Sequence, residues 1–130
     1  DESIASFVLP LGMTINMDGT AIMQVIATVF IAGCAGYTVT PGQLVVVALL
    51  ALLASVGTPA APGAGAVILF TILSGVGFVN DMALLAYSLI LAINRPIEML
   101  VTSLNVVGDA VASICVAKSE GLLNEETFNK

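Results

Sequence analysis

The most restrictive feature of this sequence is the stretch from residue 19 to residue 80, which contains no charged residue. A stretch of this length has room for two or three membrane-spanning helices of about 20 residues each. Only 9% of the whole chain is charged and 58% is apolar, whereas soluble domains carry roughly 25% charged residues. A soluble domain of this length needs much more polar surface. The sequence therefore predicts an all-α membrane protein, or a part of one.

Composition also argues against several classes of function. The net charge of −6 leaves no basic surface for nucleic acid. The chain has no His, and its two cysteines, Cys34 and Cys115, lie far apart in sequence, which argues against a zinc site and against a disulfide framework. Ser55 and Asp109 have no His or activating Lys nearby in sequence. We therefore expect neither an enzyme nor a bound cofactor.

The start of the chain is not typical of a targeting segment. The sequence begins at Asp1 and becomes apolar almost at once, without the charged region or the cleavage pattern of a signal peptide. We expect it to be a fragment of a longer protein whose N-terminal part is missing, so that sites shared with that part are incomplete here.

Residues 3–37 have the pattern of one spanning helix that is broken in the middle. The sequence Asn16-Met17-Asp18-Gly19 interrupts apolar sequence on both sides, and Asn, Asp and Gly in such proximity are typical of a loop. A break frees backbone carbonyls, which together with the Asn16 amide and the Asp18 carboxylate would form an oxygen-rich cation site. Sodium suits such ligands better than a transition metal does. The alternative is a simple kink that Asp18 caps.

Residues 41–77 have the pattern of a helical hairpin. Thr40 is a candidate N-cap and Pro41 a first-turn residue. The apolar run over residues 44–54 is too short to cross a hydrocarbon core of about 30 Å. The Ser, Gly, Thr and Pro residues of segment 55–63 end the first arm, and a second arm covers residues 64–73. Such a hairpin would re-enter the membrane, with its tip lining a cavity.

Residues 81–118 have the pattern of one long helix, of which residues 82–117 would span about 54 Å. Pro96 predicts a kink or an irregular turn within it. Residues 119–130 form a polar, acidic tail that we expect to be mobile.

The long helix carries a polar stripe. Its members follow one another at spacings of four, three and four residues and share about 60° of arc: Glu98, Thr102, Asn105 and Asp109. Carboxylates at membrane depth are costly unless they face ligands, water or ions. The alternative is a structural network that joins helices. Arg95 lies on the same side and predicts an ion pair with Glu98.

Three segments, in this order and spacing, resemble the dicarboxylate/amino acid:cation symporter family of glutamate and neutral amino acid transporters. They are PLGMTINMDGTAI at residues 10–22, ASVGTPAAPGAG at 54–65 and LNVVGDAVASICVAKSE at 104–120. The resemblance covers essentially the whole chain and implies that residues 1–118 are the C-terminal half of the transport domain. That half would contain the seventh transmembrane helix, the second re-entrant hairpin and the eighth transmembrane helix. It further implies a multi-pass protein of the cell membrane, a homotrimer, and contacts with the lipid bilayer and the missing N-terminal part.

The resemblance also implies site residues. A first sodium site would use Gly12, Asn16, Asn105 and Asp109, and a second Asn16 and Asp18. A third, which forms when the hairpin closes, would use Thr14, Ser55, Val56 and Thr58. Substrate positions would be Thr20, Ala61, Gly65, Glu98, Val101, Thr102 and Asn105. Met17 would couple ion and substrate sites, and the hairpin would act as the gate.

Two of these positions depart from the family pattern for acidic substrates. Val101 occupies the place of an Arg that pairs with the substrate side-chain carboxylate, and Glu98 occupies the place of an Asp. Glu98 can still bind a substrate ammonium, but Val101 cannot bind a carboxylate, and Arg95 is six residues earlier, about 9 Å along the axis. We therefore expect sodium-coupled, elevator-type symport of a small neutral amino acid.

Several alternatives stay open. One is symport of glutamate, aspartate or a dicarboxylate, driven by sodium or protons. Outside this class, the chain could belong to a channel or to a non-transporting membrane interaction protein. A channel would favour a continuous polar face on several helices, whereas polarity here concentrates at helix breaks. Pro59 stiffens the hairpin tip, with an effect on gating that the sequence does not define.

Overall fold

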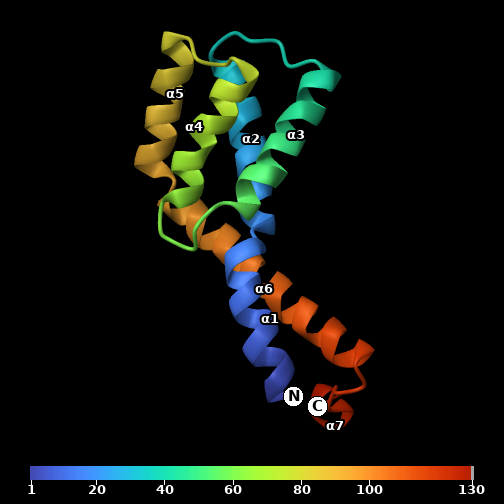
Figure 1. Ribbon diagram of the computed structural model, residues 1–130. Helices are drawn as coiled ribbons and strands as arrows, with labels where there is room; N and C mark the ends of the chain where they lie inside the picture. Colours follow the sequence, from blue (N-terminus) through green and yellow to red (C-terminus); the bar gives the residue numbers. More distant parts are fainter. Residues whose placement is uncertain (130) are drawn as a thin grey trace.

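A computed structural model describes residues 1–129, and the regular secondary structure within them is all helical, which confirms the predicted all-α class. The helices, in chain order, are α1 (Glu2–Ile15), α2 (Asp18–Cys34), α3 (Pro41–Val56), α4 (Ala64–Val76), α5 (Asp81–Ile93), α6 (Arg95–Ser119) and α7 (Glu125–Phe128). Helices α2 to α5 gather at one end of the molecule, and α1 and α6 extend to the other end, where both termini lie (Figure 1). Because α2 packs against α3, α4, α5 and α6, it is the centre of the fold.

The apolar core lies between α2, the two hairpin arms and α5. One buried cluster includes Ile31, Leu69 and Phe78, and a second consists of Val47, Ala51 and Ile72. Burial of these side chains holds the hairpin on α2. The junction of α1 and α2 lies outside both clusters, so polar contacts dominate there.

The first long helix is broken between Ile15 and Asp18, at the predicted position. Asn16 ends α1 with an extended backbone (φ −93°, ψ 98°), and its N–H donates to the Gly12 carbonyl over 2.7 Å. The Asn16 side chain donates to the Asn105 carbonyl of α6 over 3.1 Å. The break is thus stabilised by α6 as well as by local loop chemistry.

The hairpin consists of α3, a tip over residues 57–63, and α4. The first arm begins with a capping box: the Thr40 hydroxyl accepts from the Gln43 N–H over 3.3 Å, and the Gln43 side chain accepts from the Thr40 N–H over 3.0 Å. Gly63 precedes α4 with φ 87°, a conformation that a residue with a Cβ rarely adopts. Placement of this hairpin within a membrane remains a prediction.

Two expectations about the C-terminal part require correction. The structure contains two helices, α5 and α6, where the sequence suggested one, and Asn94 separates them. Pro96, which lacks an N–H and whose ring would collide with the Ala92 carbonyl in a continuous helix, fits only in the first turn of a new helix. The tail is partly ordered as α7, which Asn124 caps by accepting from the Thr127 N–H over 3.0 Å; Lys130 lies outside the described residues.

The surface is unusually apolar. Large side chains such as Phe7, Leu53, Ile93 and Met99 are exposed, which is typical of a surface that faces lipid or further protein. By length and composition, two helical stretches could cross a membrane: residues Glu2–Cys34, counted across the break, and Arg95–Ser119.

Candidate functional site

A cavity of ≈ 650 Å³ lies where the α1–α2 break, the hairpin tip and α6 meet. Asn16 and Met17 line it from the break, Thr58 and Pro62 from the tip, and Asp109 from α6. It also contains all seven positions expected to contact substrate: Thr20, Ala61, Gly65, Glu98, Val101, Thr102 and Asn105. Residues as far apart in sequence as Asn16 and Asp109, which are separated by 93 positions, therefore share one space.

Asn105 joins α6 to the start of α2. Its side-chain oxygen accepts from the Gly19 N–H over 2.8 Å, and its amide nitrogen donates to the Thr20 hydroxyl over 3.2 Å and to the Met17 sulfur over 3.3 Å. The first turn of an α-helix has free N–H groups, and Asn105 satisfies one of them. Both amide hydrogens are therefore used, so an acceptor group that binds the Asn105 amide nitrogen has to replace Thr20 or Met17, whereas the oxygen can accept a second hydrogen bond.

Asp109 is the buried carboxylate of the site, with only 6% of its surface exposed. Its Oδ1 accepts from the Asn16 amide nitrogen over 2.8 Å. A Cβ at Gly12 would overlap that same oxygen, so the Gly12 backbone lies directly against the carboxylate. Within residues 1–129 the only salt bridge joins Arg95 and Glu98, so Asp109 has no cationic partner there. A buried carboxylate held by one amide is costly unless a cation accompanies it.

Asp18 is exposed, but its carboxylate approaches α6 at Gly108. A Cβ on Gly108 would lie 2.8 Å from Asp18 Oδ2 and 2.5 Å from the Asn16 amide nitrogen. The absence of a side chain at Gly108 therefore lets the α1–α2 junction approach α6. Sequence reasoning missed Gly108, although a glycine next to Asp109 in an otherwise continuous helix was a signal for close backbone approach.

The third predicted ion site is not assembled in this arrangement. The Ser55 carbonyl accepts from the Thr58 N–H over 3.1 Å, and the Thr58 hydroxyl donates to the Ala54 carbonyl over 2.8 Å. Thr58 lines the cavity, whereas Thr14, Ser55 and Val56 do not. This site was expected only on hairpin closure and stays a prediction.

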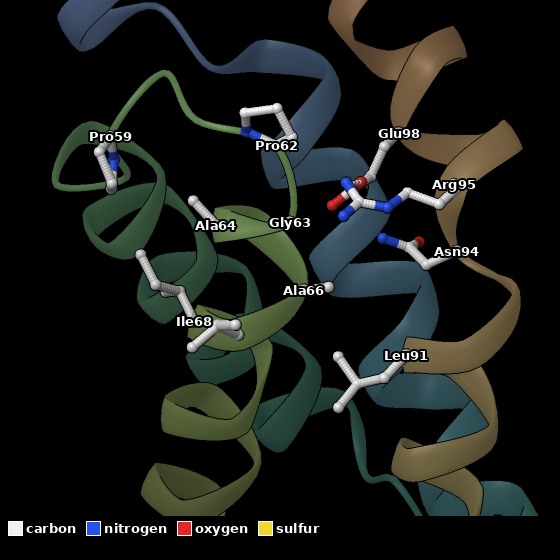
Figure 2. A pocket seen from close by; sticks show the side chains of 11 residues that line it. Pro59, Pro62, Gly63, Ala64, Ala66, Ile68, Leu91, Asn94, Arg95 and Glu98 are labelled. Carbon is white, nitrogen blue, oxygen red and sulfur yellow. Dashed lines mark hydrogen bonds and ion pairs between the residues drawn. The ribbon is translucent and has the colours of Figure 1, made fainter.

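Arg95 lines the cavity as well, although the sequence prediction did not include it among the substrate positions. The predicted ion pair is present, with Arg95 Nη1 2.9 Å from Glu98 Oε2; the Arg95 side chain is 66% exposed and that of Glu98 15%. Figure 2 shows the two side chains meeting beside Gly63 of the hairpin tip. The position of Arg95 on the polar side of α6 was a sequence signal that it lies near the cavity. Which group Arg95 faces depends on the position of the hairpin.

The model of the sodium:dicarboxylate symporter family matches residues 1–119. The chain belongs to this family. This confirms the resemblance inferred from the three motifs, and since the family is one of membrane transporters, it also confirms that the protein is not an enzyme.

The chain is also similar to excitatory amino acid transporters of several animals. The chain is 43% identical over 114 residues to an excitatory amino acid transporter of Onchocerca volvulus. This alignment covers 87% of this chain and 22% of the relative. It is 44% identical over 110 residues to human excitatory amino acid transporter 2, covering 85% of this chain and 18% of the relative. For mouse excitatory amino acid transporter 5 the identity is 40% over 113 residues, with 87% and 20% covered. The chain thus spans about a fifth of the length of the curated relatives it matches.

Proposed function

We propose that the protein containing this chain is a sodium-coupled symporter of an acidic amino acid. The observation that carries the sodium part is Asp109, a buried carboxylate with one amide partner and an adjacent helix break. A monovalent cation there would be attracted by a full negative charge at close range in a site of low dielectric constant. The family to which the chain belongs, described as sodium:dicarboxylate symporters, supports the same ion.

Two observations favour different classes of substrate. The names of the family and of the relatives favour an acidic amino acid, whereas Val101 in place of an Arg favoured a neutral one. The family description names dicarboxylates, and the relatives are named for excitatory amino acids; none of these names a neutral amino acid. An acidic amino acid needs one cation for its second carboxylate, and Arg95 supplies a cation at the edge of the cavity. Glu98 is the acid available for the substrate ammonium.

A small neutral amino acid is the second candidate, because Val101 gives part of the cavity an apolar wall. Val101 is 8% exposed and lies beside Thr102 in the lining. A carboxylate placed against Val101 would be desolvated without a partner, which is costly. This candidate requires that Arg95 stays paired with Glu98 when substrate binds.

In this proposal the hairpin tip is the gate. It supplies Thr58, Pro59, Ala60, Ala61, Pro62 and Gly63 to the cavity lining, so its movement would open or cover the substrate. The assignment of residues 1–118 to a transport domain, elevator-type movement, a homotrimer and location in the cell membrane belong to the same proposal.

Uptake by the full-length transporter in proteoliposomes tests the proposal. An inward sodium gradient should drive uptake of labelled aspartate, and replacement of sodium by choline should abolish it. Competition by unlabelled serine and alanine separates the two candidates: weak competition supports the acidic substrate, and preference for serine or alanine supports the neutral one. Uptake that is independent of the sodium gradient would contradict sodium coupling.

A further inference from the structure

A second cavity of ≈ 510 Å³ lies between the start of α4 and the junction of α5 and α6 (Figure 2). It shares part of its lining with the larger cavity, namely Pro59, Pro62, Gly63, Arg95 and Glu98. Its own residues are mostly apolar, such as Ala66, Ile68 and Leu91. The Arg95–Glu98 pair therefore stands at the boundary between the two cavities.

Asn94 contributes a buried donor to this smaller cavity. It is only 3% exposed, and its side-chain nitrogen has no hydrogen-bond partner within the part of the chain that the structure describes. Figure 2 shows the nitrogen end of Asn94 directed toward α4, next to the Arg95 guanidinium. A buried donor without an acceptor is destabilising, so the site lacks an acceptor that a ligand could bring.

The other groups around this space favour an anion. The guanidinium nitrogens of Arg95 lie 3.8 Å from the place of a Cβ on Gly63. Helix α4 starts immediately after Gly63, and its N-terminus has no side-chain cap from any described residue, so the positive end of its dipole is available. The acid that lines this space, Glu98, is paired with Arg95.

We propose that the smaller cavity is the subsite for the side-chain carboxylate of an acidic amino acid, which Asn94 and Arg95 bind together. This inference rests on the proposed acidic substrate. On binding, the substrate carboxylate takes the guanidinium from Glu98, and Glu98 becomes available to the substrate ammonium. Arg95, Glu98, the substrate ammonium and the substrate side-chain carboxylate then each have a partner, because one ion pair within the protein is exchanged for two between protein and substrate.

The same arrangement accounts for Val101. In this chain the cation lies at the first turn of α6 and not at position 101, so the apolar wall at Val101 can contact the methylene part of the substrate. Selectivity for an acidic over a neutral side chain then depends on Asn94 and Arg95.

The test measures the affinities of the full-length transporter for aspartate and serine at one saturating sodium concentration. Arg95→Gln should lower the ratio of aspartate affinity to serine affinity at least about tenfold, which corresponds to 1.4 kcal/mol. Asn94→Ala should lower it by a smaller factor, and because its nitrogen has no hydrogen-bond partner within residues 1–129, this variant should keep the wild-type unfolding temperature. Lys118→Gln removes the same charge from the last turn of α6 and should leave the ratio unchanged.

An unchanged ratio in either Arg95→Gln or Asn94→Ala would overturn the subsite while leaving an acidic substrate intact. If Arg95→Gln does not fold, Asn94→Ala and Asn94→Asp test the subsite instead. In Asn94→Asp, the new carboxylate should pair with Arg95 and abolish the preference for aspartate. A wild type that binds serine but no aspartate would overturn the proposed acidic substrate, and the subsite with it.

Discussion

The Asn16 side chain donates a hydrogen bond to Asp109 Oδ1 over 2.8 Å and thereby joins the α1–α2 break to the middle of α6. The same nitrogen reaches the Asn105 carbonyl at 3.1 Å. One amide thus orients the buried carboxylate and holds two helices that are distant in sequence. A cation at Asp109 would compete with or join this amide, so ion binding there would be coupled to the geometry of the break.

The first prediction concerns the two carboxylates at the junction. Asp109→Asn should raise the sodium concentration needed for half-maximal substrate binding by about tenfold or more, because an amide offers a dipole in place of a full charge. Asp18→Asn should have a smaller effect in the same direction, since Asp18 is exposed. Substrate affinity titrated against sodium in the full-length protein measures both. Glu120→Gln, at the end of α6, is the control, and unchanged sodium dependence in both Asp variants would refute the site.

A second prediction concerns the glycines that let the helices approach. Gly12→Ala should lower both sodium affinity and the unfolding temperature, because the added Cβ would overlap the Asp109 carboxylate. Gly108→Ala should act likewise by displacing Asn16. Gly33→Ala is the matched control: it adds a Cβ into open space and removes a glycine from a helix, so it should stabilise by up to about 1 kcal/mol. Equal unfolding temperatures for Gly12→Ala and Gly33→Ala would show that the close approach is absent.

Accessibility of the hairpin tip provides a third prediction. In a background without Cys34 and Cys115, a cysteine at Gly57 or Ala60 should react readily with an aqueous thiol reagent, since both positions are exposed. Sodium together with substrate should slow the reaction at Ala60, which lines the cavity, as the gate closes. A cysteine at the buried position Ala51 of α3 should react slowly throughout. Inert tip cysteines under all conditions would argue against a gate.

The fourth prediction concerns selectivity at position 101. For the neutral-substrate candidate, in which Arg95 stays paired with Glu98, Val101→Arg should raise the ratio of aspartate affinity to serine affinity by about tenfold, because a guanidinium would offer two parallel hydrogen bonds to a carboxylate placed against position 101. Competition binding of aspartate against serine and alanine, in wild type and variant, gives the ratio. Val106→Arg, also in the cavity lining but exposed on α6, controls for added charge. A fall in the ratio in Val101→Arg would place the substrate side chain elsewhere.

Local sequence determined where the helices begin and end. Asn16 ends α1 and Asp18 begins α2, the Thr40–Gln43 box starts α3, and Pro59 and Pro62 exclude a helix from the tip. Each of these effects depends on backbone dihedrals and on hydrogen bonds between near neighbours, which a short segment contains in full. Helical spacing likewise placed Glu98, Asn105 and Asp109 in one cavity lining, because the periodicity of a helix is independent of its neighbours.

Tertiary packing decided the properties that depend on which helix faces which. Sequence reasoning treated Asp18 and Asp109 alike, yet Asp18 is exposed and Asp109 is buried, because the Asp109 carboxylate lies against Gly12 and Asn16. It expected a kink or an irregular turn at Pro96 within one helix, whereas α5 ends at Ile93 and α6 begins at Arg95, which lies against Gly63 of the hairpin. Burial, the lack of a partner for the Asn94 nitrogen among the described residues, and the identity of the groups that Gly12 and Gly108 meet all depend on side chains far apart in the chain, and no local pattern identifies those groups.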